Sequence, residues 1–136
     1  MLRGSLIHPE ILHTLASAGH GSKVLIADSN YPVLTHSGPN AKIVYLNLSP
    51  GCVTVVQVLE QILKAVPVEK VEVMDPGTGH EPSIFAEFTQ LVDLDLTRLT
   101  RNEFYDVARS QDTALVIATG EQRTFACAIL TVGVLD

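Results

Sequence analysis

Apolar residues recur at helical spacing in several segments of the chain, and the clearest of these lies near the start. In residues 8–19, "HPEILHTLASAG", Ile11, Leu15 and Ala18 share one helical face, while Pro9 suits the first turn and Gly19 can end the helix. The spacing therefore predicts an amphipathic helix in this segment. The same kind of spacing predicts helices over residues 53–65, 82–94 and 101–111.

Uninterrupted apolar runs of strand length lie between these helices. Residues 23–27 ("KVLIA") and 41–48 ("AKIVYLNL") are examples, and further strands are predicted over residues 70–74, 113–118 and 125–132. Because the runs do not alternate between apolar and polar residues, we expect both faces of their sheet to be covered. Strands that alternate with helices predict an α/β fold, here a single three-layer α/β/α domain over residues 1–136 with a central sheet covered by helices.

The composition bears on the partners of this domain. Apolar residues make up 46% of the 136 residues and the mean hydropathy is +0.27, which is high for a small globular chain, so contacts with other subunits would cover part of the apolar surface. The formal net charge is −6 and no basic run is present. Nucleic acids and anionic membranes need a clustered positive field, so neither is an expected partner.

Cysteine and histidine spacing argues against disulfide and metal chemistry. Cys52 and Cys127 form no CxxC pair, and the histidines show no paired metal-ligand spacing, so no metal site is expected. The first residues lack the pattern of a signal peptide, and no apolar stretch reaches about 20 residues, the length of a membrane helix. These features favour a reduced, cytoplasmic setting.

The segment "SAGHGSKVLIADSNYPV" places a histidine and a carboxylate at the two ends of one predicted strand. His20 is a natural acid or base near pH 7, and Asp28 follows the strand at the sheet edge where ligands collect in α/β folds. A turn histidine and a turn acid are the alternative readings. Five extended residues span about 16 Å, so either the turn folds His20 back or a neighbouring subunit completes a site around it.

Three further residues have a structural and a functional interpretation. Arg101 is the first residue of a predicted helix. It is either an exposed helix-start arginine or a residue whose guanidinium donates hydrogen bonds to hydroxyl or carboxylate groups of a substrate. Glu121 follows Gly120 in the segment between the last two predicted strands, where it either anchors this segment or is a solvated turn acid. Cys127 lies in an apolar run without a nearby base, which is typical of a small core residue.

Taken together, "GHGSKVLIADSNYP", "RNEFYDVAR" and "ATGEQRTFACAILTVGVL" resemble the D-ribose pyranase and L-fucose mutarotase family over nearly the whole chain. The resemblance implies a cytoplasmic isomerase that interconverts anomers or ring forms of a free monosaccharide. It also implies a ring-shaped homo-oligomer that needs no cofactor. By the same resemblance, His20 is the proton donor and Asp28 contacts the sugar.

The resemblance also bears on which sugar is bound. Arg101 matches the fucose-type members, whereas ribose pyranases have histidine there. Near the C-terminus the family shows Tyr, a small residue and Asn, while this chain has Phe125, Ala126 and Cys127 as the corresponding sugar-binding positions. Phenylalanine keeps an aromatic face but lacks the hydroxyl, and cysteine replaces an amide poorly. A D-ribose pyranase, a sugar-binding module with little turnover and a purely structural oligomer remain the alternatives.

Overall fold

The computed structural model describes all of residues 1–136, which form four helices and six strands. The helices are α1 (Pro9–Ser17), α2 (Val55–Ala65), α3 (Ile84–Val92) and α4 (Arg101–Ala108). The strands are β1 (Lys23–Ala27), β2 (Lys42–Tyr45), β3 (Val68–Met74), β4 (Leu96–Leu99), β5 (Thr113–Ala118) and β6 (Ala128–Val132). All four predicted helices are therefore present.

Local hydrogen bonds fix where two of the helices begin. Thr54 caps α2 and Thr100 caps α4, and in both cases the threonine side chain accepts from a backbone N–H three residues later. The side chains of Gln57 and Glu103 return the hydrogen bond to the backbone N–H of the capping threonine. These reciprocal caps satisfy N–H groups that a helix start otherwise leaves without a partner.

One antiparallel strand lies inside an otherwise parallel sheet. The six strands are arranged in the order β2-β5-β1-β6-β3-β4, and β6 runs antiparallel to both neighbours, β1 and β3. The β2–β5, β5–β1 and β3–β4 pairs are all parallel. The carboxyl ends of β1 to β5 therefore meet at one edge of the sheet, together with the chain entering β6.

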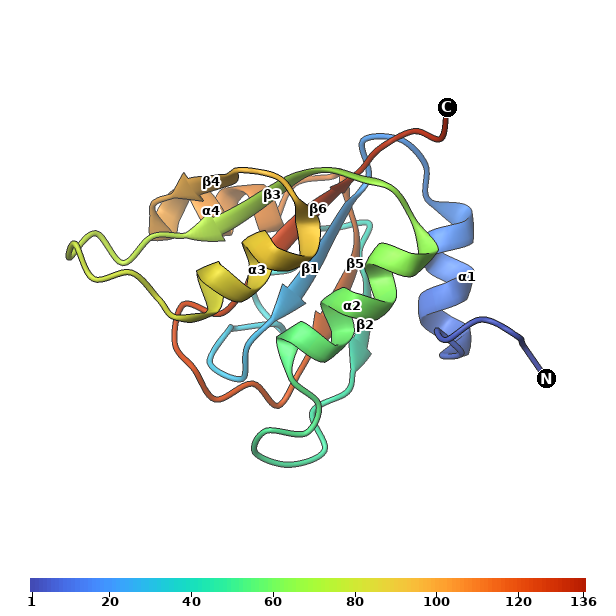
Figure 1. The fold of residues 1–136 in the computed structure, drawn as a ribbon, viewed down its shortest axis with the longest axis horizontal. Coiled ribbons are helices and arrows are strands. Elements are labelled where there is room, and N and C mark those ends of the chain that lie inside the picture. The colour runs from blue at the N-terminus through green and yellow to red at the C-terminus, as the bar shows by residue number, and fades with distance from the viewer.

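Helices cover both faces of the sheet. One core joins Val24 and Ile26 of β1 to buried residues of α1, α2 and α3, and the other joins Leu25 and Ala27 to Phe104 and Ala108 of α4. Figure 1 shows α2 and α3 in front of the strands and α4 behind β3 and β4. This arrangement confirms the expected three-layer α/β/α architecture.

The strands differ from the expectation at four places. The strand expected over residues 41–48 is shorter, Lys42–Tyr45, and the strand expected over residues 70–74 begins earlier, at Val68. The strand expected over residues 125–132 begins only at Ala128. This late start has a visible cause, because Phe125 has a φ of +55°, in the left-handed region that interrupts an extended chain. β4 (Leu96–Leu99) was not expected at all; it is a four-residue edge strand without a fully buried side chain.

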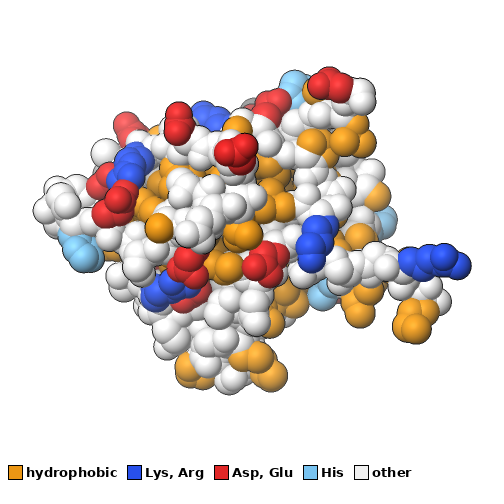
Figure 2. Space-filling model, viewed as in Figure 1, with side chains coloured by type: hydrophobic (Ala, Val, Ile, Leu, Met, Phe, Trp, Pro, Cys, Tyr) orange, Lys and Arg blue, Asp and Glu red, His pale blue; other side chains and the backbone are white.

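Two observations concern the helix lengths and the charge on one face of the molecule. The longest helix, α2, has 11 residues, and none of the helices is long and apolar enough to cross a membrane. Acidic and basic side chains are interspersed over the face seen in Figure 2, so this face carries no continuous basic patch.

Candidate functional site

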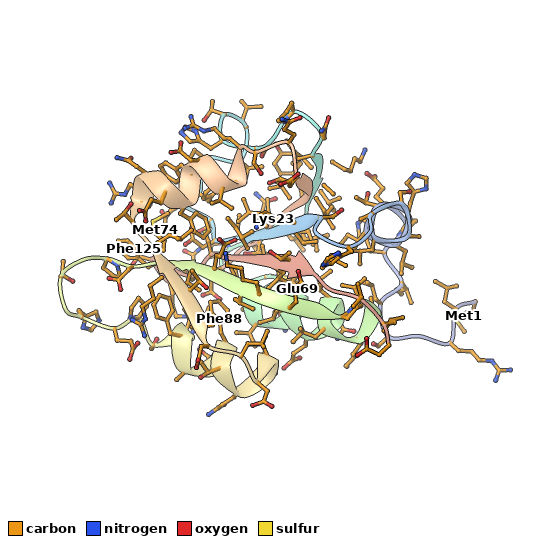
Figure 3. The ribbon with its side chains drawn as sticks, turned by 90° about the horizontal axis from the view of Figure 1, so that it is seen from above. Met1, Lys23, Glu69, Met74, Phe88 and Phe125 are labelled. Carbon is orange, nitrogen blue, oxygen red and sulfur yellow. The ribbon has the colours of Figure 1, made fainter.

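A small pocket lies at the carboxyl edge of the sheet, where four separate segments meet. Asp28 follows β1, Met74 ends β3, Arg101 begins α4, and Phe125 precedes β6; all four line the pocket, whose volume is about 160 Å³. Figure 3 shows Met74 and Phe125 beside each other at this end of the molecule. Pockets for drug-sized ligands hold about 300–1,000 Å³, so this one has room for a single small ring.

Asp28 is the buried charged group of the pocket. The residue is only 5% exposed, and each carboxylate oxygen accepts one backbone N–H: Oδ1 from Asn30 at 2.9 Å and Oδ2 from Ala126 at 3.1 Å. Its own N–H donates to Sγ of Cys127 at 3.2 Å. A carboxylate oxygen has more than one lone pair, so Asp28 can hold these contacts and still accept hydrogen bonds from ligand hydroxyls.

The predicted sugar-binding residues 125–127 meet the site in three different ways. Phe125 is half-buried and presents its side chain to the pocket. Ala126 contributes its N–H to Asp28, while its methyl group belongs to the core under α1, α2 and α3. Cys127 lines the pocket, and burial, followed by the charge of Asp28, raises the pKa of its thiol well above the usual value. The thiol is therefore neutral at physiological pH.

An aromatic wall completes the pocket, and sequence reasoning missed it. Tyr31 and Tyr105 line the pocket and meet edge to face, with 5.6 Å between ring centroids. The Tyr31 hydroxyl donates to the backbone oxygen of His36 at 2.7 Å, and burial raises the pKa of Tyr31. The sequence held a usable indication, since Tyr105 lies one helical turn after Arg101 and therefore on the same face of α4. Met74, at the carboxyl end of a predicted strand, could also have been found by position.

Arg101 is exposed and also borders the pocket, while its role in binding hydroxyl or carboxylate groups stays a prediction. Arg101 is the exposed first residue of α4, and its side chain lines the pocket with Asp28. It also lines a larger outer groove of about 530 Å³ that shares Thr124 and Phe125 with the pocket. A guanidinium, a carboxylate and an aromatic ring that line one pocket can recognise a small molecule that has several hydroxyls and one apolar face.

His20 lies at the other end of β1, outside this pocket. Its Nε2 is 3.1 Å from both carboxylate oxygens of Glu69, and the His20 side chain is 59% exposed. Figure 3 shows Glu69 well away from Met74 and Phe125. Within one chain the turn at residues 19–21 does not fold His20 back toward Asp28, so the two predicted site residues are not brought together. The proton-donor role of His20 stays a prediction.

Glu121 is an anchor rather than a solvated turn acid. The residue is 4% exposed, and its Oε1 accepts from Nε of Arg123 at 3.0 Å. Burial raises the pKa of the Glu121 carboxyl, but its hydrogen bonds with Arg123 outweigh burial and the pKa is lowered overall. Arg123 also pairs with Glu87 on α3. This carboxylate therefore fastens the loop between β5 and β6 to the body of the domain.

Comparison with known proteins identifies the family. A model of the RbsD / FucU transport protein family matches residues 1–135. The chain belongs to this family. Among relatives of the RbsD / FucU family, human fucose mutarotase is 27% identical, covering 96% of this chain and 91% of its own length. The D-ribose pyranase of Paracidovorax citrulli is also 27% identical and covers 98% of each chain.

Solved structures of RbsD / FucU proteins share the fold described above. The fucose mutarotase of Streptococcus pneumoniae in complex with L-fucose has a TM-score of 0.81 at 28% identity, covering 96% of this chain and 95% of the other. Bacillus subtilis RbsD complexed with D-ribose has a TM-score of 0.86 at 25% identity, with full coverage of both chains. The family thus includes relatives named for either sugar at similar sequence identity to this chain.

Proposed function

We propose that the chain interconverts the anomers or ring forms of a free monosaccharide, and that an L-fucose-like sugar is its substrate. The observation that carries this proposal is the pocket in which Asp28, Arg101 and Phe125 meet around space for one small ring. Relatives named fucose mutarotase and D-ribose pyranase support the same type of reaction.

In this proposal the reaction opens and recloses the sugar ring by proton transfer. One proton leaves the anomeric hydroxyl while another reaches the ring oxygen; the carbonyl group then rotates, and the ring recloses on its other face. Asp28 and Arg101 hold hydroxyl groups, and Phe125 packs against the apolar face of the ring. His20 donates the proton to the ring oxygen. A positioned acid or base supplies about 10²- to 10⁴-fold in rate, and orientation of the sugar adds to this.

A second copy of the chain would deliver His20 in this mechanism. β1 separates His20 from Asp28, and its five extended residues measure about 16 Å, which is longer than one monosaccharide. The exposed His20–Glu69 pair is free to approach the pocket of another copy. We therefore propose a ring-shaped homo-oligomer whose sites lie near the subunit interfaces.

The preference for an L-fucose-like sugar rests on the side chains around Asp28. Arg101 matches the arginine of the fucose-type family members. Met74, Phe125 and Cys127 make their side of the pocket poor in hydrogen-bond donors. A 6-deoxyhexose suits such a lining better than the parent hexose, because its methyl group replaces a hydroxymethyl group that would need a partner. This difference separates fucose from galactose, while the preference over ribose rests on Arg101. D-ribose pyranase activity is the alternative within the family.

A sugar-binding module with little turnover is the second candidate function. It is favoured by Cys127, whose sulfur accepts the N–H of Asp28 and offers a ligand no amide. Such a module would bind sugar without accelerating anomer exchange.

Exchange NMR on a panel of fucose, ribose, galactose and rhamnose tests these functions together. Saturation transfer between the anomer signals measures the exchange rate at equilibrium, and saturation-transfer difference spectra report binding. Accelerated exchange that is strongest for fucose supports the proposal. Strongest exchange for ribose indicates the pyranase, binding without exchange indicates the module, and neither effect with any of the four sugars contradicts all three.

A further inference from the structure

We propose that Arg123 is a positioning residue for the sugar pocket, holding residues 124–127 against Asp28 by bridging Glu121 and Glu87. This inference rests on the proposed function, because its effect is measured on sugar turnover. Arg123 borders the outer groove but does not line the inner pocket beside Asp28. Its effect on that pocket is therefore transmitted through the loop in which it lies.

Arg123 is bound to two carboxylates that come from different elements. Its Nε donates to Oε1 of Glu121 at 3.0 Å, and its Nη2 donates to Oε2 at 3.2 Å, so both oxygens of the buried carboxylate are engaged. The backbone N–H of Arg123 also donates to Oε1 of Glu121, at 3.2 Å. Its Nη1 donates to Oε2 of Glu87 on α3. The planar guanidinium fork suits this arrangement, and a single ammonium group cannot reproduce it.

Glu121 carries this restraint to the turn that holds Asp28. The backbone oxygen of Glu121 accepts two hydrogen bonds from Ser29, from the N–H at 2.9 Å and from the hydroxyl at 2.7 Å. On the other side, the Glu121 N–H donates to the hydroxyl of Thr119, which in turn donates to the backbone oxygen of Ala27 at 2.7 Å. The residues immediately before and after Asp28 are thus both fastened to the loop that contains Arg123.

The segment that follows Arg123 needs such a restraint. Phe125 has a left-handed φ of +55°, which a side chain disfavours, and Ala126 must direct its N–H at the Asp28 carboxylate. Arg123 fixes this segment on its N-terminal side, and the Ala126–Asp28 hydrogen bond fixes it on the other. Without Arg123, Glu121 would keep a buried charge without its cation, and the loop would have to move to hydrate that charge.

Steady-state anomer exchange in an Arg123→Met variant tests the inference. We expect kcat/KM to fall about 10- to 100-fold, mainly through a higher KM, because misplacement of a binding group by about 1 Å has effects of this size. Partial unfolding alone would lower the apparent kcat and leave KM unchanged. Arg123→Lys keeps the charge without the fork, so its KM should lie between those of Arg123→Met and the unchanged chain. Glu87→Gln, a milder change on α3, should raise KM in the same direction.

Arg98→Met is the matched control. Arg98 also pairs with two carboxylates, those of Asp75 and Glu81, and its side chain is 46% exposed compared with 38% for Arg123. Its partners lie outside the loop between β5 and β6, so we expect its KM to stay within about twofold of the unchanged chain. An unaltered KM in both Arg123→Met and Glu87→Gln overturns the inference, as does an equal rise in Arg98→Met. No exchange in the unchanged chain contradicts the proposed function instead.

Discussion

The backbone N–H of Ala126 donates a hydrogen bond to Oδ2 of Asp28 at 3.1 Å, across 98 positions of sequence. This contact joins the end of β1 to the start of β6, two neighbouring antiparallel strands. The buried carboxylate of the pocket is therefore oriented by the last loop of the chain as well as by its own turn. Changes on either side of this hydrogen bond should alter sugar binding.

Replacing Asp28 with asparagine should chiefly weaken sugar binding. Asparagine keeps one acceptor oxygen, but its NH₂ group would face one of the two N–H donors that the carboxylate now satisfies. We expect about a tenfold or greater rise in the Kd for sugar, and a loss of about 1–3 kcal/mol in the free energy of unfolding. Calorimetric titration and urea unfolding measure the two effects. Asp106→Asn on the exposed face of α4 should change neither, and unaltered affinity in Asp28→Asn would remove this carboxylate from the proposed site.

Replacing His20 with alanine should abolish most of the anomer exchange while leaving the fold intact. The His20 side chain is 59% exposed, and its one side-chain hydrogen-bond partner is Glu69. Little stability therefore depends on it. Exchange NMR and thermal unfolding measure activity and stability. His13→Ala removes an exposed histidine of α1 and serves as the control, with activity expected to be unchanged.

Mixing two impaired variants tests whether the site is shared between copies. If His20 of one copy serves the pocket of another, subunits of His20→Ala and Asp28→Asn refolded together will form some sites that contain both native residues. At sugar concentrations well below the Kd, where the weaker binding of Asp28→Asn limits its exchange, we expect the mixture to exchange anomers faster than the mean of the two variants measured alone. A mixture no faster than that mean, with mixed oligomers verified by mass spectrometry, would mean that each site is built from a single chain.

The left-handed backbone at residue 125 predicts an unusual order of stability. Glycine adopts a φ of +55° without steric cost, whereas alanine does not, so Phe125→Gly should be more stable to urea than Phe125→Ala by about 1 kcal/mol. Both variants lose the aromatic ring and should bind sugar more weakly. Equal stability of the two variants would contradict a left-handed turn at this position in solution.

Cys127 should make the protein less stable at alkaline pH. Burial and the Asp28 charge raise the pKa of its thiol above the ordinary value of 9.0 in the folded chain, so above about pH 9 the unfolded chain loses a proton that the folded chain keeps. Stability then falls with rising pH by up to about 1.4 kcal/mol per pH unit. Urea unfolding between about pH 8 and pH 10 should give a shallower fall for Cys127→Ala than for the unchanged chain. Cys52→Ala, which alters an exposed cysteine, should show the same fall as the unchanged chain.

The sequence predicted the layers of the fold because apolar spacing reports burial directly. Helix positions such as Ile11 and Leu15, and the run at residues 23–27, are buried as their patterns indicate. Leu96–Leu99 escaped notice because an edge strand of four residues, packed mainly on one side, leaves too short a pattern. The start of β6 was placed too early because apolar residues 125–127 resemble a strand, while their backbone follows a turn set by contacts with Asp28.

The candidate site was predictable in part for a comparable reason. Asp28 could be placed because a residue that follows a parallel strand must lie at the carboxyl edge of the sheet. Tyr105 could have been placed beside Arg101 by its helical spacing, but its meeting with Tyr31 depends on how α4 packs over the loop after β1, which no local spacing encodes. The partnership of Arg123 with Glu87 likewise joins residues 36 positions apart and needs the folded chain to be seen.

The position of β6 has a consequence for how the sheet is completed. This strand comes last in the chain but stands between β1 and β3, so the β2-β5-β1 group and the β3-β4 pair have no direct ladder with each other. Until residues 128–132 pair with both neighbours, each of the two parts has an open edge, and no other strand closes the gap between them. The central layer is therefore completed by the pairing of β6, and the same step brings residues 125–127 to Asp28.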